Sequence, residues 1–198
     1  MAKKTIAIIG ATETIGAIIA KNLSRGNYRL LLFGHDQAQL QGVAEGIKEV
    51  NPAADIDCIS CLVDASWEAD IIISAVPAGA EEQVAKKIRE VATQKIVISI
   101  PNPVTISSGS SVSRGTSAAE ELQKLLPNSK VVKTFNTADA VDLARAIADG
   151  KQIDSFIAGN DEEAVLTVRE IVSNAGFHPI MAGELATSRA LENARLVK

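Results

Sequence analysis

The strand-to-helix turn at residues 10–16 constrains the fold of this chain more than any other feature. It follows the apolar run Thr5–Ile9 and precedes isoleucine and leucine residues at helical spacing. Its seven residues are Gly10, Ala11, Thr12, Glu13, Thr14, Ile15 and Gly16. The first glycine permits a tight turn, the last lets helix and strand pack closely, and the free helix amides attract an anion. This context predicts a βαβ unit that binds the pyrophosphate of a dinucleotide.

Glu13 stands where the dinucleotide fingerprint has its central glycine. Its side chain adds bulk and negative charge at the point where a phosphate should approach bare backbone. In one interpretation Glu13 turns outward and a nucleotide still binds, though more weakly. In another, the carboxylate satisfies the helix amides itself, which is favourable near a helix N-terminus. The turn therefore indicates a dinucleotide site, and Glu13 leaves its occupancy open.

Apolar runs of strand length alternate with amphipathic segments of helix length along the rest of the chain. This alternation is typical of βαβ units with right-handed crossovers. We expect an α/β fold with a Rossmann-like, doubly wound, mostly parallel sheet in a single domain. Its core would span about residues 1–138 and a small C-terminal α/β extension about residues 139–198. Strands are expected at residues 5–9, 28–33, 56–62, 70–76, 95–99, 130–134, 154–158 and 178–181, and helices at 15–23, 37–50, 81–91, 117–126, 139–148, 161–173 and 184–196.

Local signals mark several ends of these elements. Ser117 and Glu120 have the spacing of a capping box, and Asn160 is expected to cap the helix that follows it. Ser66–Ala69 is too short for more than one or two helical turns. The longest irregular segment ends in the Ser-rich stretch 104–115, whose length fits either a lid or a disordered excursion.

Composition limits the classes of function. Aromatic residues make up only 3% of the chain and the net charge is −4, which argues against nucleic-acid partners. No apolar run approaches the roughly 20 residues of a membrane span, and Glu13 interrupts the run after Lys3 and Lys4 that could suggest a signal peptide. We therefore expect a cytoplasmic protein without a membrane partner.

Cys58 and Cys61 form a CxxC pair in a segment expected to be a strand. A redox-active pair normally lies at the start of a helix, where the thiol pKa is lowered. No second pair exists to complete a zinc site. We therefore expect inert thiols and no bound metal.

A set of short motifs follows in order along nearly the whole chain, and together they carry a specific resemblance. They are residues 10–16, Phe33-Gly34, Ala69-Asp70, Ala75-Val76-Pro77, Asn102-Pro103, Ala118–Pro127, Val131–Thr137, Ala158–Asp161, Gly176–Pro179, and Ala182–Arg189 with Leu191-Glu192. In this set the chain resembles the NADP oxidoreductases that depend on the deazaflavin coenzyme F-420. It is also similar to the cytoplasmic reductase domain of the six-transmembrane metalloreductases.

The resemblance implies an NAD(P)-dependent oxidoreductase that transfers a hydride between a nicotinamide nucleotide and a deazaflavin, flavin or similar acceptor. The resemblance also implies a homodimer. The turn would hold the pyrophosphate, and residues at the carboxyl ends of later strands would line the groove and the nicotinamide site. The implied cofactor-binding residues beyond the turn are Gly34, His35, Asp36, Val76, Pro77, Ala78, Asn102, Pro103, Asn136, Thr137 and Ala138, with Phe135 beside the last three. Hydride transfer depends on alignment more than on proton chemistry, so no catalytic residue is assigned.

Gly34-His35-Asp36 departs from the Gly-Ser-Arg with which this family holds the 2′-phosphate of NADP. Asp36 would repel that phosphate but could accept a hydrogen bond from the ribose hydroxyl of NAD. His35 could supply positive charge at low pH. Alternatively, both residues merely begin a solvated helix, with Asp36 as its N-cap. The choice between NADP and NAD stays open, and so does a catalytically degenerate dinucleotide-binding sensor or interaction protein.

Overall fold

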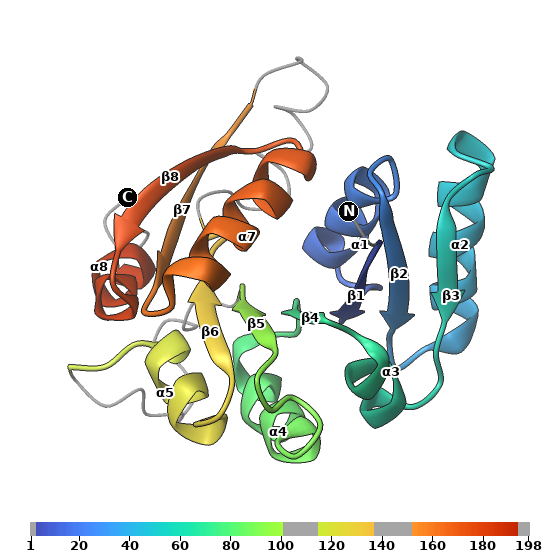
Figure 1. Ribbon diagram of the computed structural model, residues 1–198. Coiled ribbons are helices and arrows are strands. Elements are labelled where there is room, and N and C mark those ends of the chain that lie inside the picture. Colours follow the sequence, from blue (N-terminus) through green and yellow to red (C-terminus); the bar gives the residue numbers. More distant parts are fainter. Residues whose placement is uncertain (1–2, 101–114, 137–151, 194–198) are drawn as a thin grey trace.

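A single mixed sheet organises the computed structural model, which describes residues 3–100, 115–136 and 152–193. The strands are β1 (Lys4–Ile9), β2 (Tyr28–Phe33), β3 (Asp55–Cys58), β4 (Ile71–Ser74), β5 (Ile96–Ser99), β6 (Lys130–Lys133), β7 (Asp154–Gly159) and β8 (His178–Gly183). Their order in the sheet is β3-β2-β1-β4-β5-β6-β7-β8 (Figure 1). β7 is antiparallel to β6, and every other neighbouring pair is parallel. The predicted mostly parallel, doubly wound α/β fold is confirmed.

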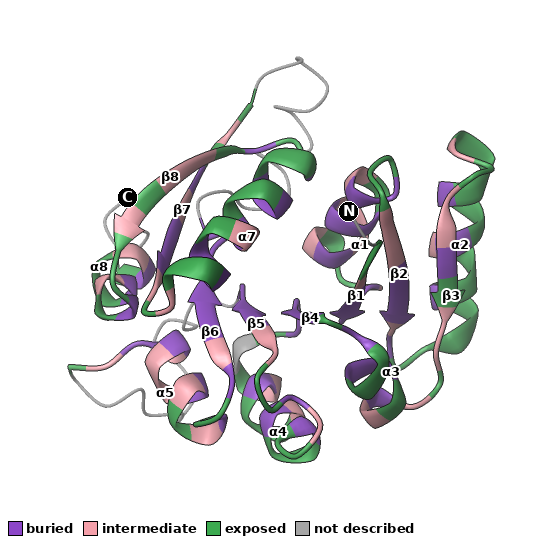
Figure 2. Cartoon of the chain, viewed as in Figure 1, coloured by how far each residue is buried: buried purple, intermediate pink, exposed green. Residues whose placement is uncertain are grey.

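Helices cover both faces of this sheet. They are α1 (Thr14–Leu23), α2 (Gln37–Val50), α3 (Leu62–Glu68), α4 (Ala78–Ile88), α5 (Ala118–Leu125), α7 (Glu162–Asn174), α8 (Ser188–Asn193) and the 3-10 helix η1 (Leu185–Thr187). Figure 1 shows α1, α2 and α7 on one face and α3, α4 and α5 on the other, and each group closes its own aliphatic core. The inner strands are mainly buried, whereas the edge strands β3 and β8 and the outer helix surfaces are more exposed (Figure 2). No helix within the described ranges is long and apolar enough to cross a membrane.

The region around the cysteine pair differs from the sequence prediction. The strand expected at residues 56–62 ends at Cys58, and Cys61 is the N-cap of α3. Leu62 and Ala65 are buried at helical spacing because α3 turns one face onto the sheet. The seven residues of α3 replace the one or two turns expected at Ser66–Ala69. The expectation that both cysteines lie on one strand was therefore wrong, although both thiols are free.

Two helix ends in the C-terminal part also differ from expectation. Asp161, and not Asn160, caps α7, because its carboxylate accepts from the Ala164 amide at 2.8 Å. Asn160 Oδ1 instead accepts from the Leu185 amide at 2.9 Å. The single helix expected over residues 184–196 is divided into η1 and α8. The helix expected at residues 139–148 and most of the Ser-rich stretch lie outside the described residues.

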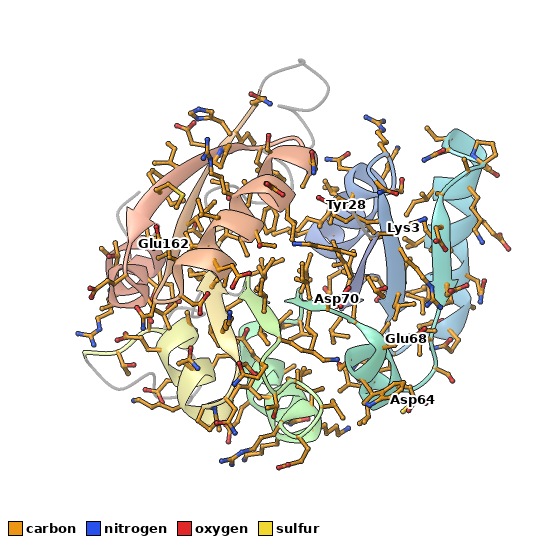
Figure 3. All side chains as sticks on the ribbon, viewed as in Figure 1. Lys3, Tyr28, Asp64, Glu68, Asp70 and Glu162 are labelled. Atoms are coloured by element: carbon orange, nitrogen blue, oxygen red, sulfur yellow. The ribbon has the colours of Figure 1, made fainter. Side chains whose placement is uncertain are left out.

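Side-chain hydrogen bonds tie α7 to the first βαβ unit. The Asn22 side chain donates to the carbonyl of Ala175 at 2.8 Å. Asn174 Nδ2 donates to the hydroxyl of Tyr28, the residue labelled at the start of β2 in Figure 3, at 2.6 Å. α7 therefore packs against the first βαβ unit, and β7 and β8 continue the sheet beyond β6.

Gly16→Ala is predicted to lower the free energy of unfolding by about 2–3 kcal/mol. A Cβ atom at Gly16 would lie 2.2 Å from the carbonyl oxygen of Gly10, which is backbone and cannot rotate away. Gly42→Ala, at an exposed α2 position with nothing within 4 Å of the new atom, should be stabilising by about 0.5–1 kcal/mol. Chemical denaturation measures both, and equal effects would contradict the packing argument.

Candidate functional site

The carboxyl ends of β1, β2 and β4 meet at the turn that follows β1. The Gly10 and Ala11 amides donate to the Phe33 carbonyl at the end of β2, at 2.9 and 3.0 Å. Gly10 has φ of +87°, and a Cβ atom on it would lie 2.9 Å from the backbone of Ala75, just beyond β4. Because the strand order reverses direction at β1, this turn lies at the switch point where α/β sheets bind ligands.

Glu13 is the N-cap residue of α1, with extended backbone angles of −69° and 148°. Its side chain is exposed and makes no capping hydrogen bond. The interpretation in which this carboxylate satisfies the helix amides is therefore wrong. Within the described part of the chain, the amides of Thr14, Ile15 and Gly16 donate no hydrogen bond, as expected for a helix start left open to solvent or to an anion.

Gly34 brings the end of β2 against this turn. A Cβ atom at Gly34 would lie 2.9 Å from the side chain of Thr12, so the two segments are in direct contact. His35 is exposed beside the Phe33 ring, with ring centroids 6.1 Å apart. Of the three residues from Gly34 onward, only His35 can carry a positive charge toward a nucleotide.

Asp36 caps the start of α2. Its Oδ1 atom accepts from the Ala38 amide at 2.9 Å and from the Gln39 amide at 3.0 Å. The N-cap interpretation of Asp36 is therefore confirmed. Capping occupies Oδ1, so Oδ2 is the oxygen that could accept from a ribose hydroxyl.

The remaining residues of the predicted groove follow strands farther along the sheet. Val76 is buried after β4, and exposed Pro77 is the N-cap of α4, so this helix begins at Ala78 and not at residue 81 as expected. Asn136 is buried after β6, 3% exposed. Asn102, Pro103, Thr137 and Ala138 lie outside the described residues.

A row of buried polar side chains crosses the carboxyl ends of β4, β5 and β6. Ser74, Ser99 and Lys133 are neighbours in register and are 2%, 0% and 0% exposed. Glu81 of α4 lies over this row and accepts from Ser99 Oγ at 3.0 Å. Burial raises the pKa of Glu81 to about 7, against the opposing effects of Lys133 and the Ser99 hydrogen bond. Glu81 can therefore exchange a proton near neutral pH.

Lys133 links this row to the C-terminal helix. Its ammonium lies 3.3 Å from Glu192 Oε1 and donates to the Ile100 carbonyl at 3.2 Å. Glu192 also accepts from the Ala118 amide at 2.7 Å and from the Ala119 amide at 3.3 Å. The same carboxylate therefore neutralises Lys133 and satisfies the first two amides of α5. Both charges are buried, and such charges are tolerated only when paired and hydrogen-bonded.

A second ion pair, nearer the surface, joins α8 to α5. The Arg189 guanidinium donates to both carboxylate oxygens of Glu120, at 2.7 and 2.6 Å. These bonds lower the pKa of Glu120 to about 2. The same glutamate closes the predicted capping box with Ser117, which is confirmed.

Sequence reasoning did not identify Glu81, Lys133 or Glu192 as members of one cluster. A lysine inside the apolar run of β6 was the available signal, because an unpaired lysine is almost never fully buried. No group of three or more potential metal ligands gathers among the residues that the structure describes.

Comparison with known proteins now identifies the family. The model of the family described as NADP oxidoreductase, coenzyme F-420-dependent, matches residues 5–103. The chain belongs to this family. The F-420-dependent NADP reductase of Methanocaldococcus jannaschii is 30% identical to it, over 94% of this chain and 87% of its own length.

Two further comparisons agree with this membership. The metalloreductase STEAP3 of Rattus norvegicus is 35% identical over 50% of this chain, which corresponds to 19% of that protein. The crystal structure of an F-420-dependent NADP reductase candidate from Arthrobacter sp. FB24 has a TM-score of 0.79 at 24% identity, covering 99% of this chain and 91% of its own. The latter shows a shared fold, and the resemblance inferred from the motifs is confirmed.

Glu81→Gln is predicted to remove part of the pH dependence of stability. The pKa of Glu81 is raised from 4.5 to about 7, so the folded protein keeps a proton that the unfolded chain loses between these values. Unfolding free energy of the wild type therefore falls as pH rises through this window and levels off above it. Stability of Glu81→Gln relative to wild type should rise across the window by about 3 kcal/mol.

Denaturant titrations from pH 4.5 upward measure this difference. Glu82→Gln is the matched control, because Glu82 is an exposed neighbour on α4 that pairs with Lys86. A Glu81→Gln profile parallel to that of the wild type would contradict a raised pKa at Glu81.

Proposed function

We propose that this protein is an NAD(P)-dependent oxidoreductase that binds its nucleotide across the carboxyl ends of β1, β4, β5 and β6. The observation that carries the proposal is the turn at residues 10–16, where two glycines lack room for a Cβ atom and a helix start offers free amides. A bound nicotinamide nucleotide would exchange a hydride with an acceptor such as coenzyme F-420, another deazaflavin or a flavin. F-420 has support from the name of the Methanocaldococcus relative.

The geometry of the turn fits a pyrophosphate. The amides of Thr14, Ile15 and Gly16 would donate to its oxygens, and the N-terminal end of α1 would favour its negative charge. Glu13 is exposed at the same helix start. Its carboxylate would oppose the ligand by charge repulsion, so we expect binding that is real but weakened.

Selection between NADP and NAD would depend on Gly34, His35 and Asp36. Asp36 is held in place as the α2 cap, and its negative charge would disfavour the 2′-phosphate of NADP. His35 would offset this charge when protonated. The named relative is an NADP reductase, so we infer that NADP binds and that Asp36 reduces the preference for it.

The rest of the proposed site follows the strand ends. Val76, Pro77 and Ala78 would line the groove together with Asn102 and Pro103, and Asn136, Thr137 and Ala138 would border the nicotinamide. These residues would align the nucleotide with its acceptor, which is the main requirement of hydride transfer. Homodimer formation and a cytoplasmic location stay predictions.

A dinucleotide-binding sensor is the second candidate function. Glu13 and Asp36 favour it, because each brings negative charge to a place where the nucleotide is negative. The rate at which NADPH is oxidised in the presence of F-420 or a flavin separates the two functions. We expect turnover that depends on the acceptor, whereas nucleotide binding without turnover would favour the sensor.

Glu13→Gly is predicted to tighten nucleotide binding at least about tenfold, which corresponds to about 1.4 kcal/mol. Glu13→Gln separates the two causes, because it removes the charge and keeps the bulk, and we expect an intermediate gain. Calorimetric titration with NADP and NAD measures all three proteins. Submicromolar wild-type binding that Glu13→Gly leaves unchanged would contradict the weakening role of Glu13, and no binding by any of them would contradict the proposed function.

Asp36→Ser is predicted to raise the affinity for NADP relative to NAD severalfold. Serine keeps the N-cap of α2 and removes only the negative charge near the 2′-phosphate. Asp161→Ser, which makes the same change at the N-cap of α7, is the matched control and should leave the ratio of affinities unchanged. An unchanged ratio in Asp36→Ser would mean that Asp36 acts as a helix cap alone.

A further inference from the structure

Phe135 adopts a backbone conformation that its residue type rarely takes. Its φ is +56°, and the other non-glycine residue with positive φ in the described ranges is Gln94, on an exposed turn. Phe135 is 3% exposed. A bulky side chain in the left-handed region is strained, and such strain persists only where neighbouring groups hold it.

Ser155 of β7 supplies the contact that holds the backbone of Phe135. Its Oγ accepts from the Phe135 amide at 3.0 Å and lies 3.0 Å from the hydroxyl of Thr134. Oγ has a second lone pair and a proton of its own, so either hydroxyl can donate in the contact with Thr134. Ser155 and Thr134 are both fully buried.

This serine acts where the pairing of β6 with β7 stops. The antiparallel register pairs Val132 with Gly159 and Lys133 with Ala158. If that pairing continued, Ser155 would face Asn136. The left-handed turn at Phe135 ends the pairing, and the Ser155 side chain takes the place of a backbone acceptor.

A second contact from the C-terminal part fixes the Phe135 ring. The Phe177 ring, which precedes β8, packs against it edge to face, with centroids 5.0 Å apart and planes at 67°. Backbone and side chain of Phe135 are therefore both held by residues beyond position 152. Asn136, the next residue, leaves this fixed turn at the carboxyl end of β6.

We propose that Ser155 is a positioning residue, which holds the Phe135 turn so that Asn136 meets the nicotinamide half of the bound nucleotide. This inference rests on the proposed function and adds a role for β7, which would then shape the cofactor site without touching the cofactor. If Ser155 had only a structural role, its replacement would affect folding but would not weaken binding of the nicotinamide half more than binding of the adenosine half.

Two ligands separate these roles by calorimetric titration. NADP spans the whole site, whereas adenosine 2′,5′-bisphosphate lacks the nicotinamide half. In Ser155→Ala we expect NADP to bind about tenfold more weakly and the fragment to bind within twofold of its wild-type affinity. Ser129→Ala, which removes another buried hydroxyl, bonded to the Ala92 carbonyl at 2.7 Å, at the opposite end of β6, should change neither affinity.

Amide hydrogen exchange gives a second measurement that needs no ligand. Exchange at the Phe135 amide should accelerate in Ser155→Ala and stay unchanged in Ser129→Ala. If Ser155→Ala fails to fold, Thr134→Val replaces it: it keeps the Phe135 bond, frees the serine hydroxyl to rotate, and should weaken NADP selectively but less.

Two kinds of result would contradict the positioning role of Ser155 or the function on which it rests. Unchanged NADP binding in Ser155→Ala, or equal weakening of both ligands, would overturn the positioning role while leaving the proposed function intact. A folded wild-type protein that binds neither ligand would overturn the proposed function, and the role of Ser155 with it.

Discussion

The absence of space for a Cβ atom at two positions of the first turn governs the rest of this structure. Gly10 lies against the backbone that leaves β4, and Gly16 lies against the carbonyl of Gly10. These contacts bring β1, β4 and the start of α1 together at the centre of the sheet, where the strand order reverses. Because the helix start is open there, the same close packing that fixes the fold also creates a site suited to an anion.

A second layer of interactions connects this centre to the C-terminal part of the chain. Lys133 and Glu192 form a buried ion pair under the carboxyl ends of the strands, and Ser155 holds the turn after β6. A buried ion pair contributes little net stability, but removing one partner is strongly destabilising because it leaves the other charge buried and unpaired. β7, β8 and α8 therefore complete the edge of the sheet at which we place the nucleotide.

The sequence predicted what periodicity and local signals control. The bounds of β2 and α2 were predicted correctly, because one is a compact aliphatic run and the other an amphipathic segment between a cap and a proline. The start of α3 was missed because its buried residues are Leu62, Ala65 and Ser66, which are too few to show an apolar period. The cluster of Glu81, Lys133 and Glu192 was missed because its members lie far apart in sequence. The first turn was found from its glycines, but the outward orientation of Glu13 needed coordinates.

The central claim is that a nicotinamide nucleotide binds with its pyrophosphate on the first turn of α1. Backbone amide chemical shifts, followed by NMR during titration with NADP, test it residue by residue. The account predicts that the largest shifts fall on Thr14, Ile15 and Gly16. Amides at the amino ends of the strands, such as that of Lys130 at the start of β6, should not shift. Saturable binding that leaves these three amides unshifted would contradict it.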